Sequence, residues 1–328
     1  MPKPLKSAGI ILSYKCTSRC RHCLYCCSPN WKGWATPELV DAICSGTLKC
    51  GVTPRAFHLA GGEAFLNFSL LLESVKIINS YGFSIDYVET NAHWYKDDDS
   101  ASDMLNQLKE AGLNCLLISA SPQHAEYIPV NKTVSLIKLS NKIFGRGGTF
   151  IWLPDFLQQL QYLGIQDTIS FDEYCTRSGQ KHAIYAAEYG GQLVPGGRAG
   201  YKTQPWLPTY PLSQCMKDNC EYELMHSENG HYDLYGNIIP SSCTGISLGD
   251  AHDLYKWQKE FSIDEKPVLN ILCKSGNVGL LEFAIKEYNY QPEDRYAGAC
   301  HLCMDIRRHL VNSADFTELT PRMMYEEI

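Results

Sequence analysis

Short apolar segments alternate with amphipathic helical patterns from residue 8 to residue 200. The predicted strands are residues 8–14, 56–60, 84–90, 114–120 and 148–153. The clearest predicted helices are residues 67–82, 102–111 and 130–144. Continuous apolar strands separated by helices predict a parallel sheet with helices on one face. In such α/β sheets a ligand binds beyond the carboxyl ends of the strands. The residues that follow each strand therefore deserve the closest inspection.

Three cysteines follow the first strand in a C-x3-C-x2-C spacing: Cys16, Cys20 and Cys23. Three thiolates on one loop can hold three irons of a 4Fe-4S cluster and leave the fourth iron open. A structural zinc site or reduced, inert cysteines are the alternatives. Zinc sites usually combine two separate pairs of ligands, which this triple does not resemble.

A Gly-Gly-Glu sequence, Gly61-Gly62-Glu63, follows the second strand. Together with the cysteine triple it resembles the radical S-adenosylmethionine (SAM) superfamily, in which these two motifs occur in this order. The resemblance implies a partial (β/α)6 TIM barrel and a 4Fe-4S cluster whose open iron binds SAM. It also implies a low-potential electron donor, flavodoxin or ferredoxin.

The resemblance further implies which residues contact SAM. Gly61, Gly62 and Glu63 are expected near its amino group, and His22 near its adenine. Polar residues at the ends of the third and fourth strands are also candidates: Asn91, Ser119 and Ser121. A sixth strand is expected at residues 192–194, followed by Arg198, which either binds a carboxylate of SAM or substrate or lies exposed to water.

Beyond residue 204 the regular alternation stops, and three prolines occur within seven residues. We therefore expect a barrel core at residues 1–204 and a small, cysteine-rich α+β domain at residues 205–328. Residues 231–240 read as a strand, a turn and a second strand. This region resembles the SPASM and shorter twitch domains, which carry an auxiliary iron–sulfur cluster.

Four cysteines of the second region are the expected ligands of a second 4Fe-4S cluster: Cys220, Cys243, Cys300 and Cys303. Cys215 is the alternative first ligand, and zinc held by the same four thiols is the alternative metal. Three histidines are possible substitute ligands: His226, His231 and His301. Cys273, read as the end of an apolar strand, is a candidate hydrogen-atom donor, although packing is the more common role for such a thiol.

Composition restricts the class of protein. The net charge of −7 and the absence of a long Lys/Arg block disfavour a nucleic-acid partner. No stretch of the sequence reaches the roughly 18 uninterrupted apolar residues of a membrane span, and no signal peptide is recognisable. Fifteen cysteines in a chain of 328 residues then indicate thiolate ligands in a reducing cytoplasm.

The expected reaction is cleavage of SAM to a 5′-deoxyadenosyl radical, which abstracts hydrogen from a substrate C–H bond. Relatives with SPASM or twitch domains act on ribosomally made peptides or on small molecules. Epimerisation or crosslinking of a peptide is the first expectation, and small-molecule maturation is the alternative. Because the chain begins almost at the first strand, a peptide substrate would need a separate recognition protein or direct capture. A non-catalytic iron–sulfur relay or binding protein would account for the cysteines but not for Gly61–Glu63.

Overall fold

The computed structural model describes residues 5–52 and 56–328. Its centre is a seven-stranded sheet in the order β5-β4-β3-β2-β1-β7-β8. The strands are β1 (Ser7–Ile11), β2 (Ala56–Ala60), β3 (Ile85–Thr90), β4 (Leu116–Ser119), β5 (Thr149–Trp152), β7 (Asn229–Tyr232) and β8 (Ile238–Pro240). Strands β1 to β5 are mutually parallel, as the sequence predicts, and each lies within a residue or a few of its predicted range.

Helices cover one face of this sheet. They are α1 (Pro37–Lys49), α2 (Phe68–Ser80), α3 (Asp98–Glu110) and α5 (Val130–Phe144). Helix α2 begins where expected because the Asn67 side chain caps it, accepting a hydrogen bond from the Leu70 amide. Helix α3 begins earlier than residue 102, because Asp97 caps it and adds a turn that contains Asp98 and Asp99. The apolar faces of these helices and of the strands form the larger of two hydrophobic cores.

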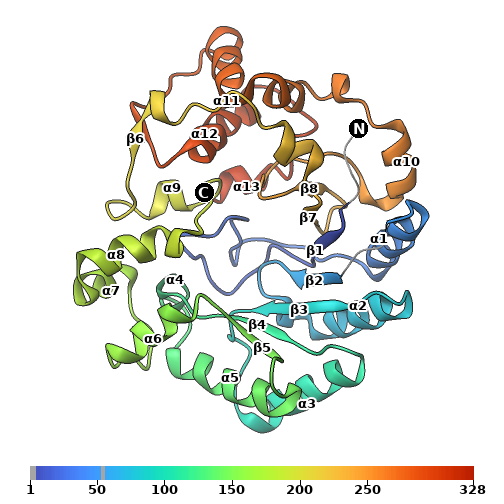
Figure 1. The fold of residues 1–328 in the computed structure, drawn as a ribbon, viewed down its shortest axis with the longest axis vertical. Helices are drawn as coiled ribbons and strands as arrows, with labels where there is room; N and C mark the ends of the chain where they lie inside the picture. Colours follow the sequence, from blue (N-terminus) through green and yellow to red (C-terminus); the bar gives the residue numbers. More distant parts are fainter. Residues whose placement is uncertain (1–4, 53–55) are drawn as a thin grey trace.

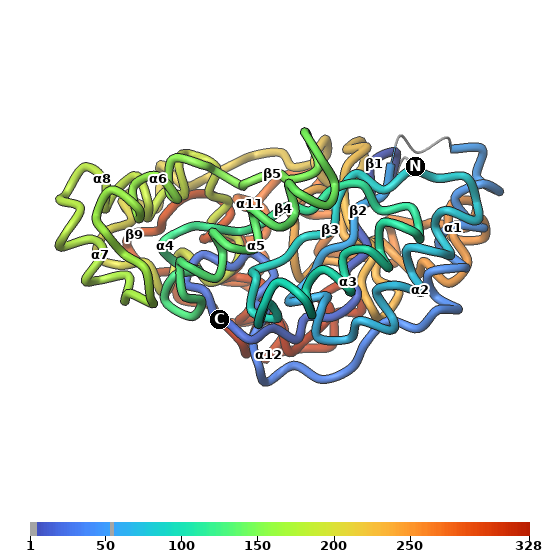
Figure 2. Tube along the Cα trace, turned by 90° about the horizontal axis from the view of Figure 1, so that it is seen from below, coloured from blue at the N-terminus to red at the C-terminus, as the bar shows by residue number. Residues whose placement is uncertain are grey.

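The second core lies at the other end of the elongated molecule (Figure 2). It is formed around α4 (Pro122–Ala125), α6 (Pro154–Tyr162), α7 (Phe171–Ser178) and α8 (Gln180–Ala187). These helices replace the regular alternation of strand and helix after β5. The sheet is therefore open at its β5 edge.

The prediction of a sixth strand at residues 192–194 is wrong. The amides of Gln192 and Leu193 donate hydrogen bonds back to Tyr189 and Glu188, so they form a turn and not a strand ladder. Gly190 and Gly191 before them adopt positive φ angles, and Pro195 after them has no amide hydrogen. The sixth parallel neighbour is instead β7, which pairs with β1 from the second part of the chain.

The predicted hairpin at residues 231–240 is confirmed as the antiparallel pair β7–β8. It lies after the expected domain boundary, yet it continues the central sheet. The remaining elements lie above the sheet in Figure 1. They are α9 (Ala199–Lys202), β6 (Tyr210–Pro211), α10 (Leu254–Glu260), α11 (Pro267–Tyr288), β9 (Arg295–Tyr296), α12 (Ala299–Ser313) and α13 (Met323–Glu326).

Helix α11 corrects the expected strand before Cys273, which lies inside this helix and is buried. Among the described residues, α11 is also the one helix with the length and apolar composition of a membrane span. Half of its most apolar window is buried inside the protein, it packs against α12, and its backbone is kinked at Gly276. These are properties of a core helix.

Candidate functional site

The loop after β1 holds three cysteines close to the carboxyl edge of the sheet. Cys16 and Cys20 are buried, and Cys23 is half-buried. Backbone amides point at two of the sulfurs: Ser18 N lies 3.4 Å from Cys16 Sγ, and Cys27 N lies 3.3 Å from Cys23 Sγ. Burial raises the pKa of Cys16 to about 12, whereas the hydrogen bond from the Cys27 thiol lowers the pKa of Cys23 to about 6. Amide donors aimed at sulfur stabilise thiolates, the form that binds iron.

The Gly-Gly-Glu segment lies directly against this loop. Gly62 N donates to Ser13 O at 2.8 Å, and Glu63 N donates to Lys15 O at 3.0 Å. A Cβ atom on Gly62 would lie 2.0 Å from Lys15 O, and Gly61 has a φ of +136°. Only glycine allows this close approach of two backbones. The two sequence motifs are therefore one structural unit.

The Glu63 carboxylate connects the ends of β2 and β3. It accepts hydrogen bonds from the Asn91 amide at 2.8 Å and from the Thr90 hydroxyl at 3.0 Å. Burial raises the pKa of Glu63 to about 7 despite these bonds. The Asn91 side chain continues the connection, because its amide nitrogen lies 3.2 Å from Thr17 Oγ1 and 3.5 Å from Cys16 Sγ. Both residues thus fix the cysteine loop to the strand ends.

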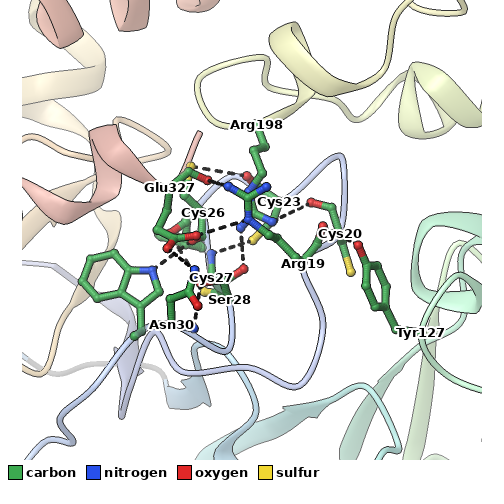
Figure 3. A network of polar contacts seen from close by, with 12 residues as sticks. Arg19, Cys20, Cys23, Cys26, Cys27, Ser28, Asn30, Tyr127, Arg198 and Glu327 are labelled. Atoms are coloured by element: carbon green, nitrogen blue, oxygen red, sulfur yellow. Dashed lines mark hydrogen bonds and ion pairs between the residues drawn. The ribbon is translucent and has the colours of Figure 1, made fainter.

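Arg198 is completely buried beneath the same loop (Figure 3). Its guanidinium donates hydrogen bonds to the carbonyl oxygens of Cys20, at 3.2 Å, and of Cys27. The expectation that Arg198 lies exposed to water is wrong, because these carbonyls and the neighbouring thiols surround it. Its Nε has no hydrogen-bonding partner among the described residues. The arginine places a positive charge beside three thiols that would become anionic on binding iron.

Residues at the carboxyl terminus also contact the cysteine loop and the segment that follows it. Glu327 accepts hydrogen bonds from Asn30 Nδ2 at 2.8 Å and from Arg19 Nε at 3.2 Å (Figure 3). Burial raises the pKa of Glu327, but its hydrogen bonds with Asn30, Ser28 and Arg19 outweigh burial and lower the pKa overall. Sequence reasoning missed Glu327, since an isolated glutamate carries no local signal.

His22, Ser119 and Ser121 lie together near the end of β4. The His22 ring stacks on Tyr189 and meets His124 edge-on. Ser121 Oγ lies 2.7 Å from His124 Nδ1. Ser119, Ser121 and His124 line a small cavity of about 10 Å³. The structure thus brings the three predicted residues to one side of the cysteine loop.

The four cysteines of the second group come from three separate segments. Cys300 and Cys303 lie on α12, Cys220 precedes a short helix, and Cys243 follows β8. The thiols of Cys300 and Cys303 lie close enough to Cys220 to affect its ionisation. Burial is the main cause that raises the pKa of Cys220 to about 12, and the charges of Cys303 and Cys300 raise this pKa further. The pKa of Cys243 is raised by burial and by the other three thiols.

Cys215, the alternative ligand, is turned away from this group. Its thiol faces the carbonyl oxygens of Tyr296 at 3.6 Å and Tyr210 at 3.8 Å. The possible substitute ligands also have other partners. His226 pairs with Glu221, His231 lies against His58, and His301 Nδ1 accepts a hydrogen bond from the Ala297 amide.

Arg307 is the buried cation of the second group. It lies one turn after Cys303 on α12 and donates to Thr244 O at 2.7 Å and to Tyr325 OH at 2.9 Å. In the described parts of the chain, no three His, Cys, Asp or Glu side chains are arranged to hold a single metal ion. A single zinc would therefore require the thiols of either group to move closer together. A set of four cysteines is found both in 4Fe-4S clusters and in structural zinc sites, so the donor types alone do not distinguish the two.

A histidine pair on the open face of the sheet was not predicted. His58 Nε2 and His231 Nε2 are 3.2 Å apart, and Tyr25 OH lies 2.8 Å from His231 Nδ1. Gly9 pairs with both histidines in register, and a Cβ on it would lie 2.2 Å from the His231 ring. Glycine inside a strand marks such close approaches, so Gly9 was the available signal.

Glu89 lies near this pair on the same face, next to Leu117 and Phe150 in the strand register. Burial raises the pKa of Glu89 to about 7, and Cys23 contributes. Phe150 and Trp152 on the edge strand are exposed large apolar side chains. The open face therefore combines aromatic, imidazole and carboxyl groups beside the cysteine loop.

No family model matches the chain. A curated relative, a proposed peptide biosynthesis protein named YydG from Bacillus subtilis (strain 168), is 23% identical over 137 residues. That match covers 42% of each chain, less than half of the relative's length. The order of the cysteine and Gly-Gly-Glu motifs along the chain resembles that of the radical SAM superfamily.

Solved structures with a similar course of the chain include BtrN in complex with AdoMet and 2-DOIA. It is 13% identical, and the alignment covers 85% of this chain and 91% of BtrN with a TM-score of 0.45. Another is anSMEcpe with bound AdoMet and the Cp18Cys peptide, at 15% identity, 79% and 80% coverage and a TM-score of 0.41. Both likenesses are distant, and the assignment of the site depends on this chain's own residues.

Proposed function

We propose that this chain is a radical SAM enzyme whose cluster is held by Cys16, Cys20 and Cys23. One observation carries the proposal: the three thiols and Gly61–Glu63 form a single backbone-paired unit at the carboxyl edge of a parallel sheet. An electron relay needs thiols, but it has no use for a glycine pair pressed against the ligand loop. When bound, the reduced 4Fe-4S cluster and SAM would supply a 5′-deoxyadenosyl radical able to abstract hydrogen from a C–H bond.

The protein's own part is orientation and exclusion of water. Asn91 and Glu63 hold the cysteine loop to the strand ends. Arg198 supports the loop from beneath, and its charge offsets the negative charge of the cysteine ligands. Gly61, Gly62, His22, Ser119 and Ser121 remain the proposed contacts of SAM, since they lie around this loop.

We assign the second cysteine group, Cys220, Cys243, Cys300 and Cys303, to an auxiliary 4Fe-4S cluster. Besides burial, Cys300 and Cys303 raise the pKa of both Cys220 and Cys243, and the buried Arg307 lies beside Cys243 and Cys303; this proximity supports the assignment. The role of hydrogen-atom donor is not proposed for Cys273, because its position inside α11 removes the reason for it.

For the substrate, we propose a ribosomally made peptide that is modified on a C–H bond, by epimerisation or crosslinking. The relative named for peptide biosynthesis supports this class. The open face of the sheet supports it as well, because exposed aromatic side chains beside a cluster site are suited to an extended chain.

The test is anaerobic reconstitution with iron and sulfide, reduction with dithionite, addition of SAM and chromatography for 5′-deoxyadenosine. The wild type is expected to produce it, and the variant Cys16→Ala/Cys20→Ala/Cys23→Ala is expected to produce none. Equal product from both proteins would refute the site. For the substrate, co-expression with a short peptide encoded beside this chain should change the peptide's mass or stereochemistry. A peptide that remains unmodified by an active enzyme would refute the substrate class.

A further inference from the structure

Arg307 is a buried cation that has no carboxylate partner in the described parts of the chain. Only 3% of its surface is exposed. The arginines that form ion pairs among the described residues are Arg19, Arg21, Arg177 and Arg322. A charged group that is buried without an opposite charge strongly destabilises a fold. We therefore expect an anion other than a carboxylate beside Arg307.

The contacts of the Arg307 guanidinium leave part of it available. Its Nη1 donates hydrogen bonds to Thr244 O at 2.7 Å and to Tyr325 OH at 2.9 Å, and both acceptors are neutral. Its Nε is buried and has no hydrogen-bonding partner among the described residues. A buried donor without a partner costs free energy unless a bound group satisfies it. The fold thus holds the guanidinium in place but leaves its charge and one N–H group without a partner.

Thiols of the second cysteine group lie beside this guanidinium. Cys300, Cys303 and Arg307 are three and four residues apart on α12, so they share one face of the helix. Burial alone would lower the pKa of Arg307. Tyr325, Cys303 and Cys243 outweigh burial and raise this pKa overall, and Cys303 is also a hydrogen-bonding neighbour of the guanidinium. The expected anion is therefore the one that these thiols form when they bind their cofactor.

A 4Fe-4S cluster held by four thiolates is an anion that gains a further negative charge on reduction. Arginine stays protonated in proteins, so its positive charge is constant. A fixed positive charge stabilises the more negative, reduced state more strongly than the oxidised state. Net charge and hydrogen bonds to the sulfur atoms are two of the means by which a protein sets the reduction potential of a cluster.

We propose that Arg307 is the charge partner of the auxiliary cluster and raises its reduction potential. The inference rests on the proposed cluster at Cys220, Cys243, Cys300 and Cys303, and it gives an electronic role to a residue outside the ligand set. Arg307 is a positioning residue, because it acts through the thiols and does not touch a substrate. With Arg307 in place, the auxiliary cluster accepts an electron more readily than it would without the arginine.

The experiment measures the midpoint potentials of both clusters in the reconstituted holoenzyme by electron paramagnetic resonance during anaerobic redox titration. Addition of SAM should change the spectrum of the first cluster alone, which identifies the auxiliary one. Arg307→Met removes the charge and should make reduction of the auxiliary cluster about tenfold less favourable, a shift of about 59 mV to lower potential. Arg307→Lys keeps the charge and should recover most of this shift.

The matched control is Arg308→Met, which removes the same charge from the next residue of α12. The Arg308 guanidinium lies over the Tyr201 ring, 5.6 Å from its centroid, and should affect the potential much less. Iron and zinc contents are recorded for every protein.

The outcomes separate the two proposals. If no cluster signal responds to SAM, the proposed function fails. If the second group holds zinc or no metal, the auxiliary cluster is refuted, and the inference with it. If both clusters form and Arg307→Met keeps the wild-type potential, or if Arg308→Met lowers it equally, the clusters stand and the role of Arg307 is refuted.

Two further results keep the charge apart from a purely structural role. If Arg307→Lys has the same low potential as Arg307→Met, the contacts with Thr244 and Tyr325 are responsible, and the inference is wrong. If Arg307→Met does not take up the second cluster, Arg307→Gln, which keeps a hydrogen-bond donor without the charge, replaces it. If neither variant takes up this cluster, Arg307 is required for assembly and the proposed effect on the potential is rejected.

Discussion

The two cysteine groups have similar surroundings, but the chain brings their thiols together in different ways. The first group lies on one continuous loop, and its three thiols are within eight residues of one another. The second group collects four thiols from segments that are far apart in the chain. Each is accompanied by one buried arginine, Arg198 or Arg307. The local group depends on its backbone contacts, whereas the dispersed group depends on the packing of α12 against the rest of the fold.

The carboxyl-terminal residues join the two groups. Tyr325 accepts a hydrogen bond from Arg307 and donates one to Gly245 O. Two residues later, Glu327 binds Arg19 and Asn30 of the first loop. Gly196 lies near both groups as well, because a Cβ on it would contact the side chains of Leu24 and Cys300. A change at one group can therefore be tested for its effect on the other.

The largest effect is expected from Gly62→Ala. The added Cβ would lie 2.0 Å from Lys15 O, so the cysteine loop and the glycine pair must separate. Because displacements of about 1 Å reduce rates by about 100-fold, 5′-deoxyadenosine formation should fall by at least that factor. Anaerobic assays with dithionite measure this, and iron analysis shows whether the first cluster is lost.

Gly196→Ala is the matched control for Gly62→Ala. A Cβ on Gly196 would meet ordinary contacts at 3.6 Å and 3.7 Å, although the residue lies near both groups. We expect nearly unchanged iron content and activity. If Gly196→Ala is as damaging as Gly62→Ala, the local backbone fit is not what makes the first group sensitive.

The second prediction concerns the dispersed group. Cys243→Ala should lower the iron content from about eight to about four per chain. SAM cleavage without substrate should continue, because the first loop retains its ligands. Cys215→Ala should keep all the iron, since that thiol faces the Tyr210 and Tyr296 carbonyls. Iron loss in Cys215→Ala, but not in Cys220→Ala, would reverse the assignment of the fourth ligand.

The difference between the groups also explains what could be predicted from sequence. The spacing of Cys16, Cys20 and Cys23 is a local pattern, and alternation of strands and helices placed it at the sheet edge. The second group was selected only through a resemblance to known domains, and its role as a cluster site stays a prediction. No spacing along the chain connects Cys220 with Cys303.

The errors arose where distant contacts decide the conformation. Residues 192–194 look like a short strand, but β7 from a later part of the chain occupies the place beside β1. Cys273 follows an apolar run that α11 accommodates equally well. Arg198 was expected in water because nothing in its own segment reveals the carbonyl oxygens of Cys20 and Cys27 that it binds.

The third prediction compares the two buried arginines. Arg198→Met leaves the carbonyl oxygens of Cys20 and Cys27 without their donor, at a cost of about 3 kcal/mol in stability. The first cluster should then be lost at a lower temperature, as followed by its visible absorbance, while the second is retained. Arg307→Met should do the reverse. The exposed Arg146→Met is the control, and equal loss of both clusters in both variants would show that the groups are one cooperative unit.

The smallest effect tests another contact assembled from distant strands, the His58–His231 pair. Burial lowers the pKa of His58 to about 4 and that of His231 to about 3. In the unfolded chain both would titrate near 6.5, so below that pH the unfolded state binds protons that the folded state excludes. Stability should therefore fall as the pH is lowered from 7.5 to 5.5, by about 3 kcal/mol for the pair.

Urea unfolding midpoints of the reconstituted protein at several pH values measure this dependence. The double variant His58→Gln/His231→Gln should be less stable at pH 7.5, because the pair is lost, but its midpoint should depend less on pH. The control His182→Gln changes an exposed histidine and should keep the pH dependence of the wild type. An unchanged slope in the double variant would mean that the two imidazoles are open to water. The space made by Gly9 would then belong to a solvent-filled face and not to a packed contact between β2 and β7.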